Sequence, residues 1–325
     1  MDGSISTSMA SRKTTVSKNG LYQSMTFVFA LQIIGYSLIF VFSIFSNVLI
    51  CIVILRKKIP HNFTNWNIFN LAVADILITL TIPFAAYENF TNKFIFGQFL
   101  CKVIYSTRNI AIYMSCLILV FISYNRFRAV TLIKQQQTVY KYTILTTLIA
   151  WIIAIIATLP QTIILTVNIN GSKNGTRCRE DWQNQDLRIA YGFFLLITFF
   201  LIPFAAISCC HVLIGWRLWH KTHPLSGRSK VVHQKKKKIV WMLVIVVTAF
   251  FICHFPPNVI FLLYELNLIT WATDIAILTS ITYWLGYSHS LWNPVIYGAL
   301  NKTMRDAILG TVFEVKKTSA NYVRR

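Results

Sequence analysis

Seven segments of the chain carry almost no charged residue over about 20 positions, the length that a helix needs to cross a bilayer. Apolar runs of this length are typical of transmembrane helices, because a helix satisfies its own backbone hydrogen bonds inside lipid. The predicted spans are Phe27–Leu55, Trp66–Tyr87, Val103–Phe127, Thr143–Val167, Ile189–Trp216, Ile239–Tyr264 and Ile275–Leu300. The expected fold is therefore an all-α membrane protein, a seven-transmembrane helix bundle at residues 27–300.

Shorter polar segments lie on either side of this bundle. Residues 1–26 are rich in Ser and Thr, and we expect an extracellular N-terminal tail without a cleaved signal peptide. In residues 301–313, apolar side chains recur at helical spacing with basic residues between them, which predicts a short amphipathic helix on the inner leaflet. Residues 314–325 are expected to form a cytoplasmic tail.

Composition and charge agree with a bilayer as the surroundings. Hydrophobic residues make up 55% of the chain and charged residues only 13%, too few for a typical soluble fold. The net charge is +21, and most of the Lys and Arg residues fall in the connections on one side of the predicted bundle. Such a bias marks the cytoplasmic face, which puts the N-terminus outside and the basic residues against anionic lipid. Nucleic acid is not an expected partner.

Outer positions hold candidate covalent features. Five of the seven cysteines lie inside the apolar spans, where they are most simply reduced and buried. Cys101 and Cys178 fall at outer, oxidising positions, and we expect one disulfide between them. Three N-glycosylation sequons begin at Asn89, Asn170 and Asn174.

Asp75 is the only acid inside any predicted span. A charge inside a membrane is costly, so it indicates a functional site whose partners can be named. Plausible partners are Ser115, Ser290 and Asn293, with a sodium ion as the candidate ligand of the group. The alternative is a protonated or water-bonded Asp75 that only holds helices together.

Arg108 is the only base deep in a span. One interpretation is a long side chain that reaches up to the outer water. The other is a cationic floor of an outward-facing cavity, where it binds a carboxylate or carbonyl of a ligand. Outer acids give the cavity rim the opposite sign, and a peptide carries groups for both. These acids are Glu88, Glu180, Asp181, Glu265 and Asp274.

Prolines occur in five of the spans and would kink each helix, which indicates a bundle able to adopt two packings. The sequence shows no metal-ligand spacing of histidines, no Gly-rich phosphate loop and no recognisable catalytic triad. We therefore do not expect an enzyme.

Motifs in the spans, taken in order, resemble the rhodopsin-like (class A) family of G-protein-coupled receptors. The matching residues are Asn47, Leu71–Asp75, Cys101 with Cys178, Asn125–Phe127, Trp151, Pro203, Cys253–Pro256 and Asn293–Tyr297. The resemblance covers almost the whole chain. It implies a plasma-membrane receptor that binds an extracellular ligand and activates a heterotrimeric G protein.

Within that family, the chain is similar to receptors of the neuropeptide Y, neuropeptide FF and tachykinin kind, which implies a peptide ligand. The implied ligand contacts are Arg108, Glu88, Gln161, Glu180, Tyr264, Glu265, Tyr283 and Tyr287. The implied G-protein contacts are Asn125, Arg126 and Phe127. The implied activation switch is His254, Pro256, Asn293, Pro294, Tyr297 and His211.

Departures from the family pattern bear on the mechanism. Asn125 stands where the family has the aspartate next to the arginine, so Arg126 lacks its adjacent carboxylate and we expect raised basal signalling. Histidines at 254 and 211 replace the usual tryptophan and tyrosine. Two other interpretations of the chain remain open. One is a receptor for a small carboxylate or a lipid that docks on Arg108, and the other is a transporter that uses Asp75 and Arg108 as a relay.

Overall fold

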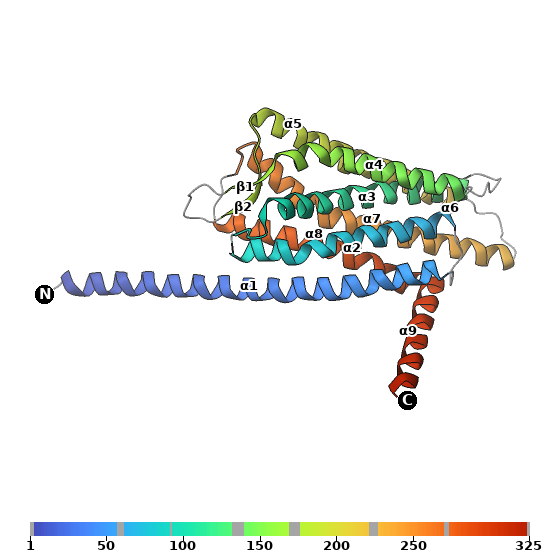
Figure 1. Ribbon diagram of the computed structural model, residues 1–325, viewed down its shortest axis with the longest axis horizontal. Coiled ribbons are helices and arrows are strands. Elements are labelled where there is room, and N and C mark those ends of the chain that lie inside the picture. Colours follow the sequence, from blue (N-terminus) through green and yellow to red (C-terminus); the bar gives the residue numbers. More distant parts are fainter. Residues whose placement is uncertain are drawn as a thin grey trace.

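The computed structural model describes residues 3–56, 62–91, 93–131, 140–168, 176–220, 227–269 and 273–323 (Figure 1). Helices make up nearly all of this part of the chain, with one short β-hairpin. The elements are α1 Gly3–Leu55, α2 Phe63–Thr91, α3 Gly97–Thr131, α4 Tyr140–Ile164, β1 Leu165–Asn168, β2 Arg177–Glu180, α5 Gln185–Leu196, the π-helical turn η1 Ile197–Leu201, α6 Ile202–His220, α7 Gly227–Glu265, α8 Thr273–Leu300 and α9 Lys302–Val323.

The predicted seven-helix bundle is confirmed. In the described residues, six helical stretches are long and apolar enough to cross a membrane, and α5, η1 and α6 together form one of them. The seventh span, α8, is more polar because its inner half carries Ser288, His289, Ser290 and Asn293. All four side chains are buried in the bundle, so lipid does not meet them.

Both ends of the chain depart from the predicted boundaries. Helix α1 begins at Gly3 and therefore takes in most of the expected tail, and α9 continues to Val323, past the end expected at residue 313. No proline interrupts α1, and neither proline nor glycine follows Phe313, so no local breaker ends either helix earlier. Figure 1 shows α9 pointing away from the bundle at a steep angle to the other helices, as expected for a helix that lies along the inner leaflet.

Helix α3 lies at the centre of the bundle and contacts α2, α4, α6 and α7. Its Met114, Ile118 and Leu119 are almost completely buried in the largest hydrophobic cluster, together with Phe250 of α7 and Tyr297 of α8. The outer faces of the helices are apolar as well. In α4 the exposed side chains include four isoleucines, Ile149, Ile152, Ile153 and Ile156. An exposed apolar belt of this kind requires lipid around it.

The π-helical turn η1 precedes Pro203, one residue into α6. The turn is widened, and the backbone N–H of Ile202 donates to the carbonyl of Ile197. A proline has no N–H to continue the regular ladder, so a wider turn just before it costs little. The turn leaves Phe199 and Phe200 buried against the bundle core.

Helices α1 and α8 approach closely at Gly35. A Cβ atom added there would lie 2.3 Å from Nε1 of Trp284, whereas one added at Gly215 would meet nothing within 4 Å. We expect Gly35→Val to destabilise the bundle by overpacking, by about 1–3 kcal/mol. Thermal unfolding of the purified protein measures this effect. Gly215→Val is the control, because it makes the same change within a helix without the contact, and equal losses in the two variants would contradict the packing argument.

Candidate functional site

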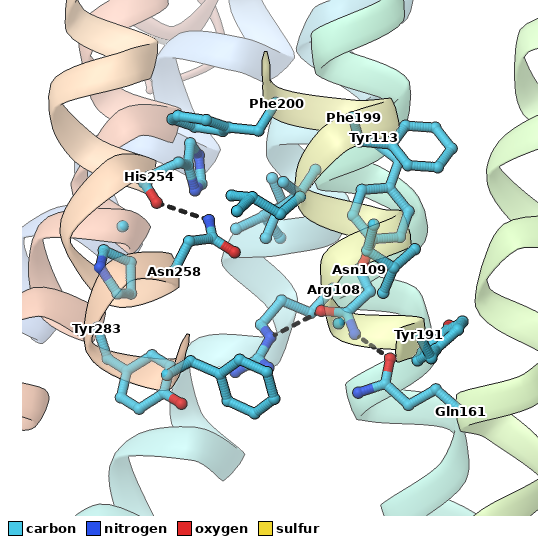
Figure 2. Close-up of a pocket in the computed structure, with 18 of the residues that line it drawn as sticks. Arg108, Asn109, Tyr113, Gln161, Tyr191, Phe199, Phe200, His254, Asn258 and Tyr283 are labelled. Carbon is cyan, nitrogen blue, oxygen red and sulfur yellow. Dashed lines mark hydrogen bonds between the residues drawn. The ribbon is translucent and has the colours of Figure 1, made fainter. Parts of the chain in front are cut away.

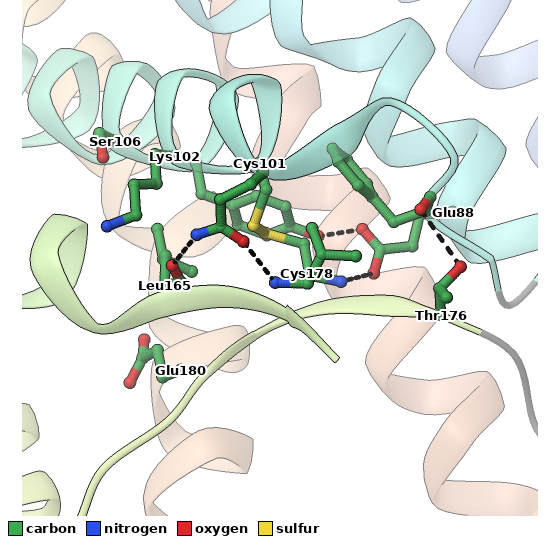
Figure 3. Close-up of a disulfide and its surroundings, with 12 residues drawn as sticks. Glu88, Cys101, Lys102, Ser106, Leu165, Thr176, Cys178 and Glu180 are labelled. Carbon is green, nitrogen blue, oxygen red and sulfur yellow. Dashed lines mark hydrogen bonds between the residues drawn. A yellow bond between two sulfur atoms is a disulfide. The ribbon is translucent and has the colours of Figure 1, made fainter. Parts of the chain in front are cut away.

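The outer end of the bundle is covered by the β1–β2 hairpin, which a disulfide attaches to α3 (Figure 3). Cys101 and Cys178 form this bond with their Cα atoms 5.6 Å apart, as the sequence predicted. Gln98, one turn before Cys101, holds β1 with both ends of its amide. Its Nε2 donates to the carbonyl of Leu165 (2.7 Å) and its Oε1 accepts from the N–H of Val167 (2.8 Å).

Glu88 fastens the other strand. Its Oε1 accepts from the backbone N–H of Cys178 (3.0 Å), and its Oε2 accepts from the hydroxyl of Tyr105 (2.5 Å). Glu88 is 8% exposed, so both oxygens are used inside the protein. The hairpin is therefore held from α2 and from α3, which makes it a rigid roof over the space between the helices.

Beneath this roof lies a cavity of about 220 Å³, lined by residues of α2, α3, α4, β2, α5, η1, α7 and α8 (Figure 2). It is small beside the ~300–1,000 Å³ of pockets that hold drug-sized ligands, so it takes the end of a chain rather than a whole peptide. Aromatic and amide side chains dominate its walls. Its charged residues are Arg108, Glu180 and Arg188, and His254 lies among the lining residues from α7.

Arg108 occupies the middle of this cavity, between Tyr283 on one side and Asn109 and Gln161 on the other (Figure 2). Its guanidinium carbon lies 5.0 Å from the ring centre of Tyr105 and 5.7 Å from that of Tyr283, within the range of cation–π contacts. Its Nε donates a long hydrogen bond of 3.4 Å to Oδ1 of Asn109. Arg108 thus lies in a cavity, and its role as a ligand contact stays a prediction.

A chain of amides connects Arg108 to the hairpin. Nδ2 of Asn109 donates to Oε1 of Gln161, and Nε2 of Gln161 donates to Oε1 of Glu180 (2.5 Å). The other oxygen of Glu180 accepts from the indole of Trp182 (2.6 Å). The cation and the acid are thus separated by two neutral amides.

The structure brings together five of the eight predicted ligand contacts. Arg108, Gln161, Glu180, Tyr283 and Tyr287 line the cavity. Two others are placed elsewhere, and the eighth, Glu265, has its side chain outside the described part. Glu88 lies under the hairpin with both oxygens bonded, and Tyr264 is 41% exposed and does not line the cavity. Glu88 therefore lies outside the cavity and bonds the hairpin and Tyr105, and its role as a ligand contact stays a prediction.

Several lining residues were not predicted from the sequence. Tyr113 stacks on Phe199 with ring centres 4.3 Å apart, and the hydroxyl of Tyr191 donates to the carbonyl of Ala157 (2.7 Å). Asn109 follows Arg108 directly, and a search for polar residues one position from the buried base would have found it. No local signal marks the two aromatic residues Tyr113 and Phe199, because their place depends on the π-helical turn.

The acid of α2 lies deeper in the bundle. Asp75 is completely buried, and its Oδ2 accepts from Nδ2 of Asn293 (2.8 Å). Its Oδ1 has no hydrogen-bond partner among the described residues and lies 3.7 Å from Nδ1 of His289. Ser290 belongs to the same polar group through Thr79, whose hydroxyl donates to it (3.2 Å) and to the carbonyl of Asp75 (2.6 Å).

The oxygens around Asp75 include several without a partner in the described part of the chain. Oδ1 of Asp75, Oγ of Ser115 and Oδ1 of Asn293 are all buried and make no hydrogen bond there. Unsatisfied buried oxygens fit a small hard cation or water, which prefer oxygen ligands. The predicted set is therefore suited to sodium, although the imidazole of His289 faces the same carboxylate.

The predicted G-protein contacts lie in the last two turns of α3, at the inner face. Nη2 of Arg126 donates to the hydroxyl of Thr64 at the start of α2 (2.9 Å). No carboxylate lies within ion-pair distance of Arg126 in the described residues, and its Nε is buried without a partner there. An alcohol therefore stands where an acid would hold the arginine more firmly.

The predicted switch residues occupy the core between the cavity and the inner face. The His254 ring lies 4.7 Å from that of Phe250 and 5.2 Å from that of His289. Pro256 and Pro294 lie inside α7 and α8. Tyr297 is 1% exposed in the core, whereas His211 is half-buried in α6.

Of the three sequons, only Asn89 lies in the described residues. It is half-buried in α2, and its Nδ2 donates to the hydroxyls of Tyr36 (3.4 Å) and Ser280 (3.5 Å). A glycan on this nitrogen would have to displace α1 and α8, so the structure argues against Asn89 as an acceptor. Asn170 and Asn174 lie outside the described residues.

Comparison with known proteins agrees with this architecture. Residues 46–297 match the family model of the 7 transmembrane receptor (rhodopsin family). The chain is 29% identical to neuropeptide FF receptor 2 of Rattus norvegicus over 87% of its own length and 73% of the relative's. It is 26% identical to neuropeptide FF receptor 1 of Homo sapiens (91% and 73%) and 27% identical to the pyroglutamylated RF-amide peptide receptor of Rattus norvegicus (89% and 71%).

The helix bundle has an outer cavity around Arg108 of α3, and most of the chain matches the family model. Together these features define the class of seven-helix receptors. The chain belongs to the rhodopsin family of seven-transmembrane receptors, the G-protein-coupled receptors. It is a multi-pass protein of the plasma membrane, and its family is not one of enzymes.

The two hydrogen bonds of Glu88 generate a prediction about stability. Glu88→Leu leaves the Cys178 N–H and the Tyr105 hydroxyl without an acceptor, and we expect it to cost about 2–6 kcal/mol, at ~1–3 kcal/mol for each group. Thermal unfolding of the receptor without ligand measures this cost. The control is Asp181→Asn, which changes an exposed acid just after β2. A Glu88→Leu receptor that unfolds with the wild type would restore Glu88 as a free ligand contact.

Proposed function

We propose that this chain is a receptor for an extracellular peptide, and that its ligand-bound form catalyses nucleotide exchange on a heterotrimeric G protein. The observation that carries the proposal is the cavity around Arg108, roofed by the hairpin and walled by aromatic and amide groups. Its size suits the terminal residues of a peptide. The relatives are receptors named for neuropeptide FF and RF-amide peptides, which favours the same ligand class.

Population shift supplies the mechanism. A ligand that contacts Arg108, Gln161 and Tyr283 spans α3, α4 and α8 and favours the packing of these helices that it fits best. His254 lines the same cavity and its ring touches those of Phe250 and His289. The cavity is thus in contact with the core around Asp75.

The inner end of α3 completes the mechanism. Movement of α7 and α8 at Pro256 and Pro294 opens the inner face next to Arg126, where a helix of the G protein inserts. The hydrogen bond between Arg126 and Thr64 belongs to the closed packing and breaks when the arginine turns toward the partner.

Nucleotide exchange on a purified G protein, with the receptor in lipid nanodiscs, tests this function. We expect a panel of short peptides to contain members that accelerate exchange, and Arg126→Ala to abolish the acceleration while peptide binding persists. The control Arg128→Ala removes a base one position beyond Phe127. A receptor that binds peptides and accelerates no G protein, or that moves ions across the membrane instead, would overturn the proposal.

The neighbours of Arg126 generate a second prediction. Asn125→Asp places a carboxylate next to Arg126, and we expect an adjacent ion pair to lower basal exchange several-fold, since ~1 kcal/mol is roughly a fivefold change in a two-state equilibrium. Basal exchange is measured without ligand on equal amounts of receptor. Asn125→Ala is the matched variant and should not lower it. Equal basal rates in wild type and Asn125→Asp would refute the idea.

We propose in addition that the polar group around Asp75 binds sodium. Asp75, Ser115, Ser290 and Asn293 would hold the ion, which would balance the buried carboxylate and favour the closed packing. His289 faces the same oxygen and competes for it. We therefore expect the ion to bind weakly.

Salt substitution tests this site. At equal ionic strength, the midpoint of thermal unfolding should be higher in sodium chloride than in N-methylglucamine chloride, because an ion that binds only the folded state stabilises it. Asp75→Asn should remove the difference and His289→Asn should enlarge it. The same midpoint for the wild type in both salts would exclude a sodium site.

A further inference from the structure

Arg108 carries a positive charge into the cavity, and no acid among the described residues pairs with it. The ion pairs of His289 with Asp75 and of Arg305 with Asp306 both lie elsewhere. Its contacts include the long hydrogen bond to Asn109 and the faces of Tyr105 and Tyr283, and the hydroxyl of Tyr287 also lies close to its charge. Neutral partners of this kind stabilise a cation less than a carboxylate does.

The two acids nearest to this region are turned elsewhere. Glu88 gives one oxygen to the Cys178 N–H and the other to Tyr105. Glu180 gives one oxygen to Gln161 and the other to Trp182. Each carboxylate therefore has a neutral donor on both oxygens, and these bonds hold the roof of the cavity in place.

The charges on the cavity wall add to the same conclusion. Arg108 and Arg188 line the cavity as bases, and Glu180 is the single acid among the described lining residues. The side chains of Asn109 and Gln161 lie between Glu180 and Arg108, so the carboxylate does not contact the guanidinium directly. Arg108 is therefore the charge on this wall that an anion would complement.

We propose that the ligand inserts a carboxylate next to Arg108, and that the receptor prefers a peptide with a free C-terminal carboxylate to the same peptide with an amidated end. A carboxylate accepts charge-assisted hydrogen bonds from a guanidinium, while an amide offers only a neutral carbonyl. The cavity of about 220 Å³ has room for the terminal residue that bears this group. This inference rests on the proposed function and names the chemistry of its ligand.

The proposal separates this chain from a relative that it resembles. That relative is named as a receptor for RF-amide peptides, and an amidated C-terminus is neutral. The same carboxylate could be the C-terminus of a peptide or belong to a small carboxylic acid. The chemistry at Arg108 is common to both sources, and the experiment below distinguishes them.

The experiment uses pairs of probes that differ only in the end group. A panel of short peptides ending in Phe is made with each member both as the free acid and as the amide, and N-acetylphenylalanine with its amide serves as the small pair. The readout is the probe concentration that half-saturates the rise in unfolding midpoint of the full-length purified receptor. We expect the half-saturating concentration of the acid to be at least about tenfold lower than that of its amide, because the acid accepts a charge-assisted hydrogen bond.

Two variants assign the preference to its residue. Arg108→Gln keeps a hydrogen-bond donor and removes the charge, so the acid and the amide should then bind equally. Arg179→Gln removes a base from the exposed part of β2, outside the cavity, and should keep the full preference. A full effect of N-acetylphenylalanine alone would indicate a small acid as the ligand, and an effect that needs the longer probes would indicate a peptide terminus. Both results support the carboxylate.

Three results would overturn the inference. They are an amide that binds as well as its acid, an acid preference that survives Arg108→Gln, and a panel in which no acid raises the midpoint. Unfolding without any probe gives an independent check. Arg108→Gln should unfold no earlier than wild type, whereas a clear loss of stability would mean that Arg108 is a structural plug. Binding is read without a G protein, so failed exchange would refute the proposed function alone.

Discussion

Hydrocarbon offers no hydrogen bonds, so every polar group that this bundle takes into the membrane needs a partner from the protein itself. The two charged groups inside the spans meet this constraint differently. Asp75 has Asn293 on one oxygen and His289 near the other, so its charge is met within the bundle. Among the described residues, Arg108 is met by the amide of Asn109 and by Tyr105, Tyr283 and Tyr287, and no carboxylate pairs with it. The acid is therefore partnered inside the bundle, whereas the base faces the cavity.

The roof of the cavity depends on the same constraint. The backbone groups at the edges of the two-stranded hairpin need hydrogen-bond partners. Gln98 and Glu88 supply some of these partners, and the disulfide of Cys101 adds a covalent attachment. Because the roof is fixed before a ligand arrives, binding loses little conformational entropy at this side of the site. The bonds that fix it also engage Glu88 and Glu180, and neither acid forms an ion pair with Arg108.

Hydropathy alone was enough to predict the seven spans, because the bilayer imposes one length and one chemistry on all of them. The disulfide could be predicted because both of its cysteines lie at outer positions. Arg108 and Asp75 stood out because a charge in an apolar run is conspicuous. Glu88 did not follow from sequence, because its role depends on a hairpin that comes some ninety residues later along the chain. The same limit applies to Tyr113, whose partner is set by the π-helical turn, and to the ends of α1 and α9, where no breaker marks a boundary.

We propose that the cavity around Arg108 and the inner face at Arg126 are two binding sites coupled by one conformational equilibrium, between the closed and the open packing of the helices. Thermodynamic linkage requires that a G protein bound inside changes ligand affinity outside by the same factor that the ligand changes G-protein affinity. The most direct measurement is the affinity of one activating peptide for the nanodisc receptor with and without nucleotide-free G protein. We expect tighter peptide binding in the complex, and we expect this gain to be lost when GTP dissociates the complex. The same affinity in both states would show that the two sites are not coupled.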